Sequence, residues 1–419
     1  MGQGSRWPLG LCPSYPRSEP RCLLCVRVAL LAGRFRHRSA RRRLFASAAL
    51  LGAMNVLHGC GADSTSELPT PGATSSWSPV EVLGVPVDEG VFDPAPTDDS
   101  SGTTWMSYSY VSAPTSTVPR TVETRLAITQ DGGLRWHDMG LTLNAATPLP
   151  LPPPNDRNAA VHEVSRLLYN TEALAAGSDP WLLLWHRYLS VLVGTESTRQ
   201  FQHGWIGMKS GPTATTLGAE RKLFTGAGYD PANNSDALGA PEYPLDQLYP
   251  DTLGDCAAFT EPGVLAKPEG VYVSLVCAKT TPPGDIVLLR CDHQLHGCVL
   301  LGVLLSGAEA SALTPTFDNF SASELVTSRG ADYLLATPTS SVGGHRYRGC
   351  VAYPVNLPGA QVHRDAGEVP VPSLVLGPHG DFNGACGYSA GLTASGVLMG
   401  EAFFTEQPIF RVYATGAHP

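Results

Sequence analysis

The stretch that most constrains the fold of this chain is an eight-residue turn at residues 129–136. It reads Thr-Gln-Asp-Gly-Gly-Leu-Arg-Trp and stands between a strand-like run and a run led by Trp136. The carboxylate of Asp131 is suited to accept hydrogen bonds from backbone N–H groups about two residues later, and the glycines that follow it tolerate positive φ angles. Trp136 then begins the next strand as an apolar wedge. An ordinary Asp-Gly hairpin turn is the competing interpretation, because this dipeptide is a common hairpin signal.

Short β-type runs separated by turn signals extend from about residue 80 to the C-terminus, with no amphipathic helix of convincing length between them. The 44 glycines and 36 prolines favour such a chain of short strands. The runs form five groups at a spacing of about 65 residues. These groups cover residues 91–143, 160–225, 256–305, 320–376 and 385–414. In the first group, the turn at 129–136 separates the third run from the fourth.

The spacing of Thr129, Asp131, Gly133 and Trp136 resembles the Asp box of sialidase-type β-propellers. In those families the box is a structural turn on the outer edge of a blade and does not hold the active site, so the resemblance implies a fold and not an activity. With the box between the third and fourth runs, the expected fold is an all-β β-propeller. Five blades are the preferred number and six the alternative. A pair of two-sheet sandwiches is the structural rival.

The N-terminal segment has the organisation of an export signal. Residues 1–60 hold ten arginines and one acid, Glu19, and six of those arginines lie between residues 34 and 43, just before the apolar run 44–57. A basic region followed by about 14 apolar residues is typical of a secretory signal and is short for a membrane span. The next residues, Leu57-His58-Gly59-Cys60, resemble a bacterial lipobox with Cys60 as the lipidated residue, although His58 replaces the usual Ala or Ser. Cleavage without lipidation is the alternative. Residues 42–45 also resemble a weak twin-arginine signal, which a plain arginine-rich region explains equally well.

Three segments are therefore expected: a signal segment with its lipobox at 1–60, a flexible tether at 61–79, and the propeller domain at 80–419. The tether is rich in Ser, Thr, Pro and Gly, a composition that cannot bury a core, so we expect the chain before residue 80 to be disordered. A second apolar run at 22–33 precedes the basic cluster, which an early start codon would explain. The expected location is outside the cytoplasm, as a membrane-anchored lipoprotein.

Charge limits the partners. Beyond residue 60 the chain carries 18 basic and 36 acidic residues, so the net charge of the body is about −18. Such a surface argues against nucleic acid and against direct binding to an anionic membrane. We expect a monomer that meets the membrane only through its anchor, takes a glycan as its partner, and needs no cofactor.

Six cysteines follow Cys60, and in an exported protein an even number predicts three disulfides with 15 pairings to choose from. Cys256 and Cys277 lie symmetrically about the turn at residues 267–268, so a hairpin would bring them opposite each other. Cys291 and Cys298 flank the turn 292–297, where a disulfide would staple a turn that lacks the hydrogen bonds of an Asp box. Cys350 and Cys386 then remain, and they would join the fourth group to the fifth.

A metal site is the alternative at residues 291–298. Cys291, His293, His296 and Cys298 together offer two thiolates and two imidazoles, which suit Zn²⁺. Because an oxidising compartment favours the disulfide, no metal is expected.

Acidic residues on the first run of each group are the candidates for chemistry, since the innermost strands of a propeller surround its axis. Asp93, Glu163 and Glu261 occupy this position in the first three groups. The arrangement resembles that of five-bladed glycoside hydrolases of the arabinanase and xylosidase kind. That resemblance implies a general base at Asp93, a supporting carboxylate at Glu163 and a general acid at Glu261, with Glu163 standing where the family has Asp. Turn formation by Asp93 and backbone bonding by the two glutamates form the structural alternative.

A sugar platform is a second expectation, at Trp185, His186 and Arg187, with Trp181 and Tyr188 on the same strand. Alternation along a strand places only half of such residues on one face, so a core role for the others is the alternative. Two classes of function stay open: a surface-anchored glycan hydrolase or lyase, and a non-catalytic propeller that binds glycan or protein. True sialidase chemistry needs an arginine triad for the substrate carboxylate and a Tyr-Glu pair, and the first group contains no Arg-Ile-Pro motif.

Overall fold

The computed structural model describes residues 77–86, 89–112, 121–149, 158–193, 196–231, 238–341, 346–380, 382–403 and 409–419. The expected signal segment, Cys60 and the tether as far as residue 76 lie outside these ranges. Within the described ranges, no helix has both the length and the apolar character that crossing a bilayer requires.

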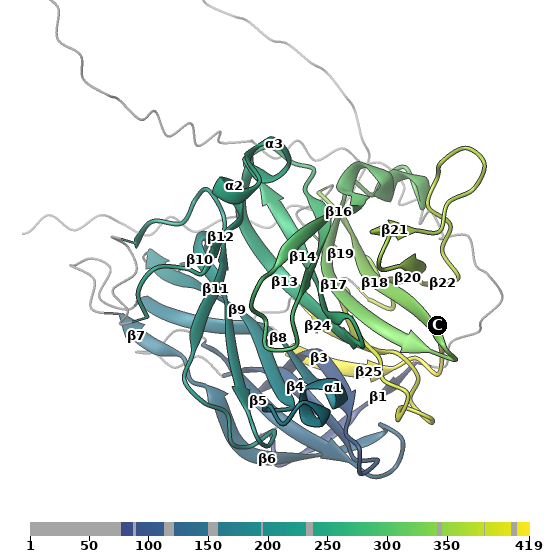
Figure 1. Ribbon diagram of the computed structural model, residues 1–419. Coiled ribbons are helices and arrows are strands. Elements are labelled where there is room, and N and C mark those ends of the chain that lie inside the picture. Colours follow the sequence, from purple (N-terminus) through teal and green to yellow (C-terminus); the bar gives the residue numbers. More distant parts are fainter. Residues whose placement is uncertain are drawn as a thin grey trace, which may run out of the picture. The chain divides into compact units, whose positions relative to one another are not determined.

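Five mainly antiparallel sheets, here called blades 1 to 5, follow one another along the chain (Figure 1). Blade 1 consists of β3 (Gly90–Asp98), β4 (Thr104–Val111), β5 (Val122–Thr129) and β6 (Arg135–Asn144), with β2 (Glu81–Leu83) parallel to β6. Blade 2 consists of β7 (Thr147–Leu149), β8 (Asn158–Tyr169), β9 (Trp181–Val193), β10 (Glu196–Gly211), β11 (Arg221–Thr225) and β12 (Tyr243–Pro244), with α1 (Thr171–Ala175) between β8 and β9.

Blade 3 follows the short helices α2 (Leu245–Leu248) and α3 (Pro250–Leu253) and consists of β13 (Cys256–Lys267), β14 (Gly270–Lys279), β15 (Asp285–Cys291) and β16 (Val299–Ser306). After the 3₁₀ helix η2 (Gly307–Ala312), blade 4 has β17 (Asn319–Ser328), β18 (Ala331–Ser340), β19 (Arg346–Tyr347), β20 (Cys350–Asn356), β21 (Gln361–Val362) and β22 (Leu374–Leu376). Blade 5 has β23 (Asn383–Gly387), β24 (Leu398–Phe403), β25 (Ile409–Ala414) and β1 (Ser78–Pro79).

The first strands of the five blades pack against one another in a closed order, namely β3, β8, β13, β17, β23 and again β3. The protein is therefore a five-bladed β-propeller, and the expected fold and blade number are confirmed. Each of the five expected groups supplies the strands of one blade, and the connection between the second and third groups contains β12, α2 and α3.

Strand β1 closes the ring. Ser78 pairs with Ala414 and Pro79 with Tyr413, so a strand from the start of the described chain completes the blade formed by its end. The amide of Val80 continues this contact with a 2.9 Å hydrogen bond to the carbonyl of Val412. The strand falls just before residue 80, inside the segment expected as tether. Because β1 comes just before blade 1 in the sequence and pairs with the last strand of blade 5, it links the two ends of the propeller.

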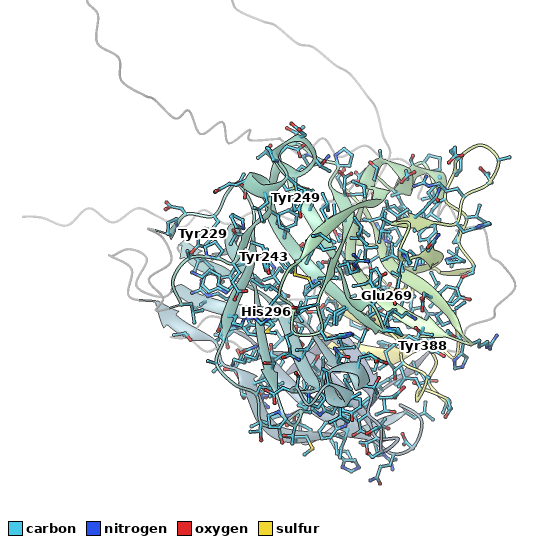
Figure 2. The ribbon with its side chains drawn as sticks, in the orientation of Figure 1. Tyr229, Tyr243, Tyr249, Glu269, His296 and Tyr388 are labelled. Atoms are coloured by element: carbon cyan, nitrogen blue, oxygen red, sulfur yellow. A yellow bond between two sulfur atoms is a disulfide. The ribbon has the colours of Figure 1, made fainter. Side chains whose placement is uncertain are left out.

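The hydrophobic cores lie between blades, because each sheet is covered on both faces. In β15, Val287 and Leu289 belong to the cluster shared with blade 2, and Ile286 and Leu288 to the cluster shared with blade 4. This explains the continuous apolar run of β15, which is typical of a strand buried on both sides. Tyr243 and Tyr249 pack onto the first of these clusters from the connection between blades 2 and 3 (Figure 2).

The turn at 129–136 is built from the hydrogen bonds expected of its residues. Asp131 Oδ1 accepts from the backbone amides of Leu134 (3.1 Å) and Arg135 (3.0 Å), and Trp136 is fully buried. Gly133 has a φ of 97°, and a Cβ there would lie 2.3 Å from the hydroxyl oxygen of Ser395. The glycine is thus required twice, by its φ angle and by the close approach of blade 5.

Three disulfides join Cys256 with Cys277, Cys291 with Cys298, and Cys350 with Cys386, in agreement with the expected pairs. The thiolates that the alternative metal site requires are consumed by the second of these bonds. One expectation about this turn was wrong, since Asp292 accepts hydrogen bonds from the amides of Gln294 (3.0 Å) and His296 (2.7 Å). The disulfide therefore adds to an Asp-centred turn and does not replace one.

Candidate active site

Each of the five innermost strands carries a β-bulge with one residue in the left-handed region. These residues are Asp93 on β3, Val164 on β8, Glu261 on β13, Ala322 on β17 and Ala385 on β23, with φ angles between 50° and 53°. The bulges interrupt the pairing of each strand with its neighbour at equivalent places. A positive φ costs a non-glycine residue about 1–3 kcal/mol and is characteristic of functional sites. The five bulges thus define one level of the axial channel.

Two of the three predicted acids occupy this bulge position, and the third precedes it by one residue. Asp93 and Glu261 are the left-handed residues of blades 1 and 3, and Glu163 stands directly before Val164 in blade 2. In blades 4 and 5 the position holds alanine. The carboxyl groups are therefore confined to one side of the ring.

Hydroxyl groups from neighbouring strands hold the three carboxylates. Asp93 is 2% exposed and accepts a 2.6 Å hydrogen bond from Ser109 on β4. Glu163 accepts one from the phenol of Tyr188 on β9. Glu261 accepts a 3.2 Å hydrogen bond from the phenol of Tyr347 on β19, in the next blade.

The electrostatics of Glu261 connect the three acids. Burial is the main reason that its pKa is raised well above the usual value, and the negative charges of Asp93 and Glu163 raise it further. Arg166 and the Tyr347 hydrogen bond oppose this rise in pKa. Acids from three blades thus lie within electrostatic range of one another, and Glu261 is the one driven toward its protonated form.

An aromatic group lies beside Glu261 that the sequence did not reveal as part of a site. The ring of Tyr347 stacks on that of Phe382 with 4.3 Å between centroids, and Phe382 lies 6.1 Å from Phe92. Phe410 packs against Phe92 at 5.6 Å. Tyr347 and Phe382 are only partly buried. Their proximity to Glu261 arises from the packing of blades 3, 4 and 5, for which the sequence carries no local signal.

The expectation of an exposed sugar platform on β9 is wrong, because its three residues are buried. Trp185, His186 and Arg187 are 0%, 1% and 5% exposed. Trp185 belongs to the core between blades 1 and 2, where its ring fills the space beside Gly207. The guanidinium of Arg187 lies 3.8 Å from the centre of the Trp205 ring, a cation–π contact inside blade 2. Their neighbour Tyr188 donates a hydrogen bond to Glu163, and His186 pairs with Glu163 across the β8–β9 ladder.

Asp93, Glu163 and Glu261 line neither of the following two cavities. One of about 580 Å³ lies on blade 4 between β20, β21 and residues 363–368. The other, of about 250 Å³, lies in the axial channel beyond the bulge level and is lined by all five blades, with Arg166, Glu324 and Tyr388 among its residues.

No protein-family model matches the sequence, and no curated protein is similar to it. Solved structures with a similar fold include a family 117 glycoside hydrolase from the marine bacterium Zobellia galactanivorans, at 11% identity over 81% of this chain and 89% of that one, with a TM-score of 0.44. The arabinanase of Bacillus subtilis is 11% identical over 77% and 93% of the two chains, with a TM-score of 0.40. A family 32 glycoside hydrolase of Bifidobacterium adolescentis is 11% identical over 80% and 55%, with a TM-score of 0.46. These structures are glycoside-hydrolase propellers.

Proposed function

We propose that the propeller body is a glycoside hydrolase whose acid/base residues are Asp93, Glu163 and Glu261. The observation that carries the proposal is that three innermost strands bring Asp93, Glu163 and Glu261 within electrostatic range of one another at the bulge level, with Glu261 buried; burial and the two neighbouring carboxylates raise its pKa. Glycosidic cleavage needs one protonated and one ionised carboxyl group, and this electrostatic coupling supplies both within a single cluster.

In the proposed reaction, protonated Glu261 donates its proton to the glycosidic oxygen as the bond from that oxygen to the anomeric carbon breaks. Ionised Asp93, held by the Ser109 hydroxyl, takes a proton from the water that attacks the anomeric carbon. Glu163, held by Tyr188, supports the acid by keeping a negative charge beside it. The products are two hydroxyl-terminated sugars, and a later proton transfer from Asp93 to Glu261 through solvent restores the site.

The test is an assay of the protein without residues 1–60 on α- and β-glycosides and on polysaccharides. Glu261→Gln, which keeps the shape but has no proton to give, is expected to lower kcat at least about 100-fold, in line with the loss of a general acid. Glu123→Gln, an acid on β5 outside the cluster, is the matched control. Activity that survives Glu261→Gln unchanged would remove this site.

Tyr347→Phe gives a second test, because it should shift the pH–rate profile, which a purely structural role of Glu261 would leave unchanged. The Tyr347 hydrogen bond lowers the pKa of Glu261, so its removal raises that pKa further. The falling alkaline limb of the pH–rate profile should therefore move to higher pH. A profile that keeps its position would contradict the role of Glu261 as acid.

A propeller that binds glycan or protein without catalysis is the second candidate. It is favoured by the burial of Asp93 (2% exposed) and Glu261 (9% exposed), since carboxylates so enclosed also suit a purely structural role in the channel. Glycan binding without turnover on any substrate in the screen, unaffected by Glu261→Gln, would favour it.

We further propose that the protein is exported and lipidated at Cys60, on the strength of the basic region, the apolar run and the lipobox-like residues before it. In the Cys60→Ser variant, the protein should no longer be found in the membrane fraction.

We also propose that the turn at 129–136 is an Asp box of the sialidase-like kind, supported by the two amide hydrogen bonds to Asp131. It serves the fold and not the chemistry.

A further inference from the structure

The axial cavity of about 250 Å³ contains two buried charged side chains with unused hydrogen-bonding groups. Arg166 on β8 is 1% exposed; its Nη1 donates to the carbonyl of Ser165 at 3.0 Å, while Nε and Nη2 are buried without a partner in the described structure. Glu324 on β17 is 5% exposed, and its Oε2 is likewise buried and unpartnered. Leaving such buried groups unsatisfied destabilises a protein, and more so when they are charged.

These two residues do not form an ion pair with each other, since no contact within 4 Å joins them among the described ion pairs. Burial raises the pKa of Glu324 to about 8, against the weaker opposing effects of Arg166 and the Tyr388 amide. At neutral pH, Glu324 is therefore mainly protonated and can donate a hydrogen bond. Two side chains from different blades then present donors to the same cavity.

We propose that this cavity binds a small aliphatic monocarboxylate, whose two oxygens accept hydrogen bonds from Arg166 and from the protonated carboxyl group of Glu324. The fork of a guanidinium matches the geometry of a carboxylate. The remaining wall suits a short hydrocarbon tail, because Leu168, Val264 and Val326 line it.

Access comes from the end of the channel at which the innermost strands finish. Thr171 and Ala390 line the cavity and are exposed, so the cavity reaches solvent beside α1 and after β23. Tyr388 lines the cavity and lies near the C-terminal segment (Figure 2). Its ring centroid is 5.8 Å from that of His418. A ligand would thus enter without passing the acid cluster.

Other titratable groups around the cavity come from each packed element: Asp98 on β3, Tyr169 on β8, Glu261 and Lys267 on β13, Asp332 on β18, and Tyr388 after β23. Asp98 is engaged by Thr104, Ser389 and the Gly391 amide, and Lys267 by Asp332. Arg166 therefore remains the cation with unused donors that lines the cavity in the described structure.

The experiment titrates sodium propionate into the whole protein at pH 6.5 by calorimetry. Propionamide serves as the uncharged analogue of propionate, and sodium chloride supplies a spherical anion for comparison. Propionate is expected to bind, propionamide at least about tenfold more weakly because it lacks the charge that Arg166 attracts. Ala266→Phe, a change at the partly exposed rim that fills the cavity and spares the charged pair, should abolish binding. Arg364→Gln, which removes an arginine on blade 4, should leave it unchanged.

The pH dependence gives the second arm. Affinity for propionate should fall above about pH 8 as Glu324 ionises, and Glu324→Gln, which keeps a donor at every pH, should remove this fall. No heat of binding in the wild type, or binding unaffected by Ala266→Phe, would overturn the proposal. Because the readout is binding and not turnover, it stands or fails independently of the glycosidase assay.

Discussion

Ser109 on β4 donates a hydrogen bond to Asp93 on β3, with 2.6 Å between Oγ and Oδ2. Oγ of Ser109 also accepts a 3.1 Å hydrogen bond from the backbone amide of Val164, the left-handed residue of β8. One hydroxyl therefore orients a candidate catalytic acid of blade 1 and fastens the bulge of blade 2. The bond crosses from one sheet to the next at the level of the acid cluster.

Ser109→Ala should destabilise the protein by about 1–3 kcal/mol, because it leaves a buried carboxylate and a buried amide each short of a partner. Urea unfolding measures the change. Ser107→Ala is the matched control, since Ser107 lies two residues earlier on β4, is equally buried and has a hydroxyl without a described partner. Equal losses for the two variants would show that the link between the blades contributes nothing.

Gly133→Ala should cost more than Gly102→Ala. Both glycines have positive φ angles, 97° and 82°, so both alanines bear the backbone strain of about 1 kcal/mol. Only the Cβ at 133 meets other atoms, at 2.3 Å from Ser395 Oγ and 2.6 Å from Leu392 Cδ2, while the space at 102 is open. Thermal unfolding compares the two. A cost at 133 no larger than at 102 would mean that the turn does not press against blade 5.

Removal of the Cys350–Cys386 disulfide should destabilise the protein more than removal of Cys291–Cys298. The first disulfide closes a loop between cysteines 36 residues apart, and the second closes a loop between cysteines 7 residues apart. On chain entropy alone, these correspond to about 4 and about 2 kcal/mol. Paired Cys→Ser variants, followed by denaturant unfolding without reductant, give the comparison. The reverse order would mean that the turn at 291–298 depends on its disulfide despite the Asp292 hydrogen bonds.

Glu324 should make the protein less stable as the pH rises from about 4.5 to about 8. Its folded pKa of about 8 exceeds the ordinary 4.5, so in this window the folded state holds a proton that the unfolded state has released. The free energy of unfolding then falls with pH, by up to about 1.4 kcal/mol per unit, and becomes level above the folded pKa. Glu324→Gln removes this contribution. The free energy of unfolding of the variant, relative to that of wild type, should therefore increase as the pH rises from about 4.5 to about 8. A constant difference between the two proteins would refute the shift.

Strand positions were predictable along almost the whole body because they depend on local signals. The runs that became β3 to β6 are bounded by turn residues, and the hairpin symmetry of Cys256 and Cys277 placed their disulfide correctly. The error at Trp185, His186 and Arg187 has a physical cause. Alternation distinguishes the two faces of a strand, but in a blade covered on both sides neither face is exposed.

By itself, the sequence determined the five groups of strands, the hydrogen-bonding turn at 129–136 and the pairs Cys256–Cys277 and Cys291–Cys298, because each depends on residues close in the chain or opposite in one hairpin. Cys350 and Cys386, on different blades, were paired only by elimination. The tertiary structure alone decided that Ser78–Pro79 closes the ring, that Tyr347 reaches Glu261, and that Arg166 and Glu324 share a cavity. Those contacts join residues on different blades. Which side chains meet there depends on how the sheets pack about the axis, and no periodicity along one strand carries that information.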